Sequence, residues 1–292
     1  MSRRGAYRAG EVHPTVRNAL AAGCRCRHGR SMTATTPPKL GIQLGSALSP
    51  LELPQFAAHC EQVGYRQQWI AEDSFAYGGI AAAASVLAAT EESMVGIGVL
   101  ASVVRHPAVA AMEFAQLAGA YPGRVIAGLG HGAPGWMRQM GVKQRSPLTA
   151  LEECATGIRA LLDGATITHR GDYFSFDDIG LTHVPAQRVP IFTGVHGAKS
   201  LALSARVADG TLLGWFSSPD YVRWAIDQID APGHIAATLA ITSIDRDGRA
   251  ARDRIRPFVA SSVDAMVRSP QTSETDVATA DPLDVYAVAG DP

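Results

Sequence analysis

The residues from Thr193 to Lys199, TGVHGAK, combine two glycines with a lysine directly after a short apolar run. The residues that follow have a helical pattern, so Gly194 and Gly197 fall at the start of a helix. Glycines expose backbone amides at a helix N-terminus, and the helix dipole and a lysine cation both favour an anion there. We therefore predict an anion-binding site at Gly194, Gly197 and Lys199, with an ordinary strand-to-helix turn as the alternative.

Two carboxylates, Glu72 and Asp73, directly follow another apolar run, Tyr65 to Ala71, which predicts a second strand. In barrels built from parallel strands, functional groups lie just after the strands, at one rim. A carboxylate in that place can exchange a proton with a bound molecule or bind one of its polar groups. A solvated acidic loop is the alternative for this pair.

The stretch from Gly130 to Gly135, GHGAPG, matches the G-x-G-x-x-G pattern of dinucleotide-binding loops and contains His131. In dinucleotide-binding folds this loop follows the first strand. Here it follows the apolar run from Arg124 to Leu129, which is the fourth predicted strand. A lone match in that place is weak, so we do not favour a dinucleotide-binding domain.

The elements that must position these residues are predicted from the periodicity of apolar side chains. From Lys39 onward, short apolar runs alternate with helical patterns, which is typical of strand–helix units and a parallel sheet. The best-defined helix begins at Pro147 behind a Ser146 N-cap and ends before Gly164. Strands are predicted over 40–44, 65–71, 94–99, 124–129, 189–193, 211–215 and 236–243, further helices over 54–63, 81–90, 107–119, 199–208 and 249–266, and a hairpin-like excursion over 166–176.

Composition excludes several functional classes. Of the 292 residues, 47% are hydrophobic and 18% are charged, which is typical of a soluble globular protein with a sizeable core. The net charge of -1 provides no electrostatic basis for binding nucleic acid or an anionic membrane. No apolar stretch approaches the roughly 20 residues of a membrane helix. The four scattered cysteines form no metal-binding pair, so we predict no metal site and a reducing, cytoplasmic location.

Residues 1–38 differ in character from the rest of the chain. The first 31 are rich in arginine and lack the apolar core of a secretory signal, although a targeting arm is an alternative. We expect 1–38 to be disordered or an over-called N-terminal extension, with translation starting at Met32. We treat 39–292 as a single domain.

The residues from Arg124 to Gly164 closely resemble the fourth strand and following helix of the bacterial luciferase-like flavin oxidoreductases. The resemblance is greatest to the branch that uses the deazaflavin coenzyme F420 and includes methylenetetrahydromethanopterin reductase. It extends over roughly residues 39–245, with further matches at Trp69-x-x-Glu72-Asp73, Arg105-His106-Pro107, Gly194-x-x-Gly197-Ala198-Lys199 and Val207-Ala208-Asp209-Gly210. The chain departs from the family pattern in two places. No histidine accompanies the acidic pair, and Ala198 replaces a proline.

The resemblance implies a TIM-type (β/α)8 barrel. A closed barrel needs eight strands, because closure removes the edges of the sheet, whereas seven are predicted here. In the family, a segment like Ala287 to Pro292 leads into the last helix and the last strand. We therefore expect an α/β barrel that is incomplete at the C-terminus, with its last helix and strand missing.

The resemblance also implies an enzyme, an oxidoreductase that transfers a hydride between F420 and a small organic substrate. The residues implied for the cofactor are Gly194, Gly197 and Lys199 for its phosphate and Ala101, Ser102 and Gly130 for its ring. A backbone bulge near Ala101 and Ser102 would support that ring. The residues implied for catalysis are Glu72 and Asp73, as polar or proton-handling groups, and His131, as a substrate contact or a partial plug of the pocket. Trp136, Met137 and Met140 are candidates for the mouth of the pocket.

Two alternatives stay open at this point. FMN could be the cofactor of a luciferase-like monooxygenase, because the same barrel and phosphate site serve both cofactors. The chain could instead be an inactive truncated barrel or a partner subunit, which the missing eighth unit and the absent histidine favour. In either case we expect a homodimer.

Overall fold

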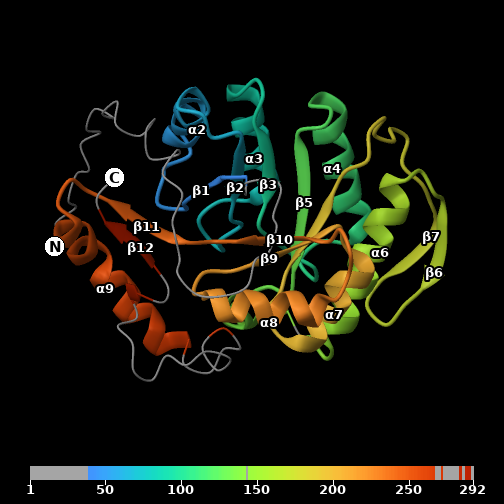
Figure 1. Ribbon diagram of the computed structural model, residues 1–292. Coiled ribbons are helices and arrows are strands. Elements are labelled where there is room, and N and C mark those ends of the chain that lie inside the picture. Colours follow the sequence, from blue (N-terminus) through green and yellow to red (C-terminus); the bar gives the residue numbers. More distant parts are fainter. Residues whose placement is uncertain (1–38, 143, 267–270, 272–282, 285–286, 291–292) are drawn as a thin grey trace.

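The computed structural model describes residues 39–142, 144–266, 271, 283–284 and 287–290. The expected N-terminal extension, residues 1–38, lies outside these ranges. A curved parallel sheet runs through the middle of the molecule, and helices lie along its outer side (Figure 1). None of the described helices is long and apolar enough to cross a membrane.

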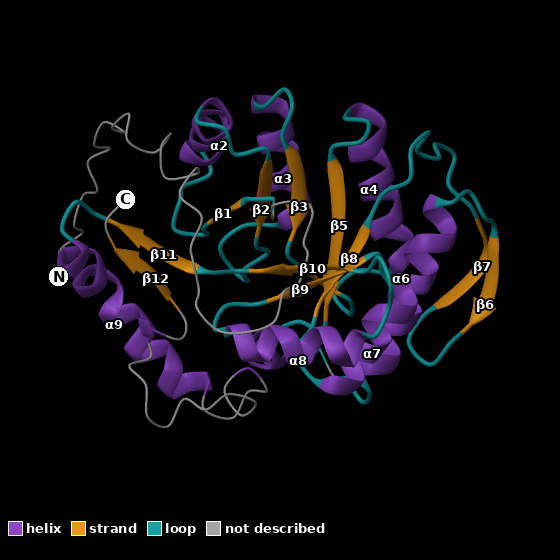
Figure 2. Ribbon diagram, viewed as in Figure 1, coloured by secondary structure: helices purple, strands orange, loops and turns teal. Residues whose placement is uncertain are grey.

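The main sheet contains eight strands, and all of its pairs are parallel (Figure 2). Every residue of the two strands β5 and β9 is buried, because side chains cover both faces of the sheet. The parallel, barrel-type α/β arrangement that the sequence predicts is therefore confirmed. In spatial order the strands are β1 (Ile42–Leu44), β2 (Gln67–Ile70), β3 (Met94–Ile97), β5 (Val125–Gly130), β8 (Ile191–Gly194), β9 (Gly210–Leu213) and β10 (Ile235–Thr238), and β4 (Leu100–Ala101) pairs with β5.

The connecting helices follow the predicted start signals closely. The Ser146 hydroxyl accepts a hydrogen bond from the Thr149 amide at 3.3 Å, and Pro147 occupies the first helical position of α6, as expected. The helices are α2 (Glu52–Gln62), α3 (Gly79–Ala89), α4 (Pro107–Ala120), the short α5 (Pro134–Gln139), α6 (Pro147–Leu162), α7 (Ala198–Val207), α8 (Pro219–Ile229) and α9 (Gly248–Met266).

The predicted hairpin is confirmed as an antiparallel pair, β6 (Ile167–Arg170) and β7 (Ser175–Ile179). Its turn is fastened to α6 by the Glu153 carboxylate. That carboxylate accepts hydrogen bonds of 2.8, 3.0 and 3.1 Å from the amides of three consecutive residues, 172–174.

The seventh predicted strand, 236–243, is wrong as a single element. Residues 235–238 form β10 in the main sheet, whereas β11 (Ile241–Ile244) pairs in parallel with β12 (Ala287–Gly290) in a separate two-stranded sheet. The sequence AATLAITS contains no glycine or proline that would signal the break. Among the described strands, β1 and β10 are the two edges of the main sheet, which is therefore open between them.

Large side chains fill the interior of the sheet only because glycines face them. Trp69, Ile126, Phe192 and Leu212 form one buried cluster. A Cβ added at Gly96 would lie 2.4 Å from the Trp69 ring, and one at Gly128 would lie 1.6 Å from the carbonyl oxygen of Ile97. These positions require glycine for space and not for a special backbone conformation.

We predict that Gly128→Ala lowers the free energy of unfolding by about 3 kcal/mol or more, because the new methyl group would overlap backbone atoms that cannot move aside. Gly119→Ala is the matched control, since Gly119 is exposed in α4 and an added Cβ there meets nothing within 4 Å. The control is expected to be neutral or slightly stabilising. Urea unfolding of both variants checks this, and equal stabilities would contradict it.

Candidate functional site

A cleft of about 570 Å3 lies at the carboxyl ends of β2, β4, β5 and β8. Its position agrees with the rule that functional groups of parallel barrels gather at this rim. Its volume is within the range of ordinary small-molecule sites. The predicted site residues that line it are Glu72, Asp73, Ala101, His131 and Gly194.

The floor of the cleft is formed by a backbone bulge between β3 and β4. Gly96 pairs with Ile126 and Leu100 pairs with Leu129, so three residues, 97–99, face two, 127–128. A bulge was expected near Ala101 and Ser102, but those residues continue in register. Ala101 pairs with Gly130, and the Ser102 amide donates to the Gly130 carbonyl at 2.8 Å. The extra residue therefore lies earlier, around Val99.

Val99 packs against Gly130, where the family resemblance implies contact with a cofactor ring. A Cβ on Gly130 would come within 2.5 Å of one Val99 methyl group, and one on Gly194 within 2.8 Å of the other. Gly130 does not line the cleft, and neither does Ser102, which is buried and whose hydroxyl makes no hydrogen bond with any described residue. Contact between the cofactor ring and Gly130 or Ser102 stays a prediction. Val99 lines the cleft and is therefore the better-placed candidate for that contact.

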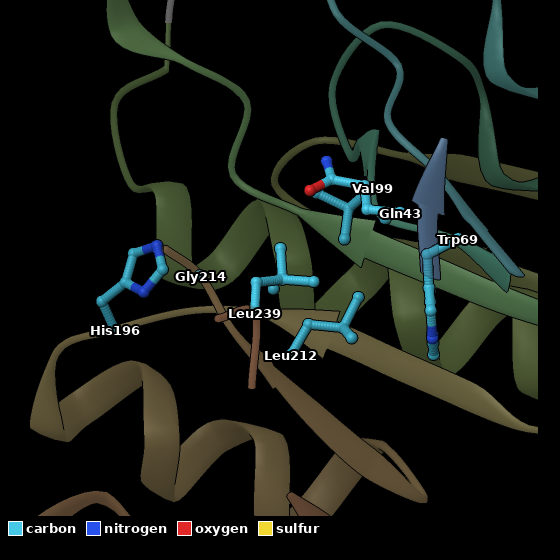
Figure 3. Close-up of a pocket in the computed structure, with 9 residues that line it drawn as sticks. Gln43, Trp69, Val99, His196, Leu212, Gly214 and Leu239 are labelled. Atoms are coloured by element: carbon cyan, nitrogen blue, oxygen red, sulfur yellow. The ribbon is translucent and has the colours of Figure 1, made fainter. Parts of the chain in front are cut away.

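The cleft continues past Val99 into a smaller chamber of about 170 Å3 inside the sheet. Figure 3 shows Val99, Leu212 and Leu239 between His196 on one side and Trp69 on the other. The two cavities share Gly98, Val99, Gly194 and His196 as lining residues. Sequence reasoning overlooked Val99 and His196, because neither an isolated valine nor a histidine inside a glycine-rich loop signals which way its side chain points.

Glu72 is held in an ion pair and is not a free carboxylate. It binds Arg105 through both oxygens, at 2.7 and 2.9 Å, and it also accepts from the Gly79 amide at 2.8 Å. Arg105 in turn lies 3.4 Å from Glu113. The arrangement ties the end of β2 to the starts of α3 and α4, so it favours a positioning role for Glu72. A proton-transfer role for Glu72 stays a prediction.

Asp73 lies next to this network, and its carboxylate lines the cleft. No hydrogen bond or ion pair to its side chain is present among the residues that the structure describes, and its charge helps to raise the pKa of Tyr77, after desolvation of that phenol by burial. Asp73 is therefore the acidic group that is available to a bound molecule.

His131 connects the loop after β5 with two helices. Its Nδ1 lies 3.1 Å from the Pro147 carbonyl and its Nε2 lies 3.0 Å from the Ser200 hydroxyl. A carbonyl can only accept, so Nδ1 carries the proton and the neutral ring accepts from Ser200 at Nε2. Desolvation by burial lowers the pKa of His131, although the hydrogen bond to Pro147 opposes the shift.

His196 lines the cleft and the inner chamber and is the more deeply buried of the two histidines. Burial, and secondarily the neighbouring His131, lower its pKa to about 4. The Gln271 amide nitrogen lies 3.0 Å from Nδ1, so Nδ1 accepts and the neutral ring is protonated at Nε2. Both histidines are therefore uncharged near pH 7.

The predicted anion segment begins α7. Gly197 is its N-cap, and Lys199 is exposed in the first turn, outside the residues that line the cleft. The next residue, Ser200, reaches His131, so this helix start adjoins the cleft. The Ser200 and Leu201 amides donate to the Gly197 carbonyl at 2.9 Å, whereas the Ala198 and Lys199 amides have no hydrogen-bond acceptor among the described residues and could bind an anion.

Two of the three residues predicted for the pocket mouth line the cleft. Trp136 and Met137 come from the short helix α5, which follows the glycine-rich loop. Met140 is exposed and does not line it. Within the described part of the chain, no group of three or more metal-ligating side chains is present.

Comparison with known proteins gives a consistent family. A family model described as luciferase-like monooxygenase matches residues 31–287. The 5,10-methylenetetrahydromethanopterin reductase of Methanolobus tindarius is 31% identical over 230 residues, which cover 75% of this chain and 70% of that protein. The F420-dependent glucose-6-phosphate dehydrogenase of Microbacterium testaceum is 31% identical over 189 residues, which cover 60% of this chain and 56% of that protein.

A solved structure shares the fold. The coenzyme F420-dependent tetrahydromethanopterin reductase from Methanopyrus kandleri superposes with a TM-score of 0.75 at 21% identity, over 87% of this chain and 86% of the other. The family that the motifs indicate is therefore confirmed. The cytoplasmic location and the homodimer stay predictions.

We predict that Glu72→Gln lowers the free energy of unfolding by about 2–3 kcal/mol. The change removes one partner of a largely buried ion pair and leaves Arg105 without its bidentate acceptor. Asp73→Asn is the matched control and should change stability by less than about 0.5 kcal/mol. Denaturant unfolding measures both, and a Glu72→Gln protein as stable as the wild type would show that the pair has no structural role.

We predict that protonation of His196 makes the protein less stable at acidic pH. Its pKa is about 6.5 in the unfolded chain and about 4 in the folded one, so the unfolded chain binds the proton first as pH falls through this window. Stability is therefore full above pH 6.5 and decreases by about 3 kcal/mol by pH 4. His196→Gln should remove this part of the pH dependence, and the exposed control His183→Gln should retain it. Unfolding free energies measured between pH 4 and 7 check the difference, and parallel curves for all three proteins would contradict it.

Proposed function

The chain belongs to the luciferase-like monooxygenase family, and from that premise we propose that it is an oxidoreductase that transfers a hydride between coenzyme F420 and a small organic substrate. The observation that carries the proposal is one cleft at the carboxyl ends of the strands, which a carboxylate lines and a helix start adjoins. The name of one relative supports the choice of cofactor, since it specifies an F420-dependent dehydrogenase.

The residues present fit an anionic, ring-bearing cofactor. The start of α7 supplies backbone amides and the Lys199 cation, which is the donor chemistry that a phosphate needs. Val99 and Ala101 offer an apolar floor next to this helix start. We assign Gly194, Gly197 and Lys199 to the cofactor phosphate on this basis.

When bound, a deazaflavin supplies a carbon centre that takes up or releases a hydride. The chain's own residues would do the rest. Trp136 and Met137 would exclude water from the cleft, and the Glu72–Arg105 pair would hold the β2 end in place. Asp73 would hold or release the proton that accompanies hydride transfer, and His131 would keep α7 in position through Ser200.

A flavin-dependent monooxygenase that uses FMN is the second candidate. It is favoured by the description of the matching family itself, luciferase-like monooxygenase, and by a phosphate site that would serve FMN equally. Quenching of tryptophan fluorescence separates the two, because Trp136 lines the cleft and Trp69 lines the chamber below it. An inactive barrel or a partner subunit is the third candidate, and the two open edges of the described sheet favour it.

We predict that Lys199→Ala weakens F420 binding about tenfold and leaves the fold intact, because it removes one charge-assisted contact from an exposed position. Lys39→Ala is the matched control, since Lys39 is an exposed lysine that precedes β1. Fluorescence titration gives the dissociation constants, and thermal unfolding verifies the fold. Unchanged affinity in Lys199→Ala would remove the phosphate assignment.

A further inference from the structure

The described residues that line the cleft present a net negative charge to a bound molecule. Of the described residues that line it, Glu72 and Asp73 are the charged ones at neutral pH, because His131 and His196 are held neutral. Glu72 is neutralised by Arg105. Asp73 therefore contributes the uncompensated charge, and no described arginine or lysine lines the cleft to offset it.

Arg105 is not free to receive a second anion. It is shared between two carboxylates, Glu72 at 2.7 Å and Glu113 at 3.4 Å. Desolvation by burial raises the pKa of Glu113, and Arg105 opposes the shift, in a cluster that is only partly buried. A phosphate or carboxylate placed beside Arg105 would have to displace one of these acids.

Most of the remaining lining is apolar. Val99 and Val104 come from the segment around β4, and Trp136 and Met137 come from α5. Such surfaces bind the body of a ligand by burying its apolar area. The polar groups near them are already hydrogen-bonded: the Gln144 side-chain amide donates to the backbone carbonyl of His131, and the His131 ring contacts Pro147 and Ser200.

Charge is unevenly distributed around the cleft. The start of α7, with Lys199, adjoins the cleft through Ser200 and is its positive end, whereas Asp73 lines the cleft and is negative. One anionic group is favoured beside the start of α7, and a second anion would be repelled by Asp73.

We propose that the substrate of this site is an uncharged organic molecule with an apolar body and a hydroxyl group that donates a hydrogen bond to Asp73, and not a phosphorylated or carboxylated compound. This inference rests on the proposed function, since it takes the positive end of the cleft as the cofactor's. It separates this chain from its dehydrogenase relative, whose name specifies glucose 6-phosphate, an anionic sugar.

The test uses two ligands with one body and different charge, cyclohexylmethanol and cyclohexanecarboxylate. F420 is first titrated alone into the full chain by tryptophan fluorescence. Each ligand is then titrated into the F420-saturated protein by ligand-observed NMR, with the wild type, Asp73→Asn and the control Asp227→Asn. Asp227 is an exposed carboxylate on α8, away from the cleft.

We expect the alcohol to bind the wild type and Asp227→Asn about tenfold or more tightly than the carboxylate. In Asp73→Asn the ratio should fall towards one, because the repulsion of the anion and the hydrogen bond to the alcohol are both reduced. Equal or tighter binding of the carboxylate to the wild type, or F420 binding with no binding of the alcohol, overturns the inference alone and leaves the proposed function standing. Failure of F420 to bind in the first titration overturns the proposed function, and this inference with it.

Discussion

The close approach of the β3–β4 connection to the backbone of β5 is the constraint on which the site depends. One extra residue in that connection pushes the Ile97 carbonyl against Gly128 and turns Val99 inward between Gly130 and Gly194. A side chain at any of these glycines would separate the strands. The same bulge forms the floor of the cleft and the roof of the chamber below it. Packing and the shape of the site therefore have one physical cause, and neither can change without the other.

Burial and hydrogen bonding determine which polar groups in the site can act. Arg105 forms an ion pair with Glu72. The His131 ring is hydrogen-bonded to the Pro147 carbonyl and the Ser200 hydroxyl, and the His196 ring is hydrogen-bonded to Gln271. Each of these groups would be costly to leave unpaired in a partly dry cavity. Among the described residues, Asp73 and the start of α7 remain available to bound molecules. A site can orient two ligands when a few unpaired polar groups are held in fixed positions.

The sequence predicts the elements of this fold better than the contacts between them. The cap at Ser146, the proline after it and the hairpin beyond α6 are local signals, and all are found as predicted. The family resemblance implies that four residues lie at one rim of the sheet, and all four line the cleft there: Glu72, Asp73, His131 and Gly194. The partner of Glu72 lies 33 residues away, and nothing in the spacing reveals it. The break after β10 is not predicted because the residues from 236 to 243 contain no glycine or proline to mark it.

The attachment of the β6–β7 hairpin has a consequence for how such a chain can diverge. Its turn is anchored by Glu153, a residue of the preceding helix, and Gly171 leaves room for that carboxylate. An exposed strand residue such as Asp177 makes none of the hydrogen bonds that anchor the turn. Substitutions at exposed positions along the two strands therefore leave the hydrogen bonds that anchor the turn unchanged. Natural selection can rework this appendage as a recognition or assembly element while the catalytic rim beside it is conserved.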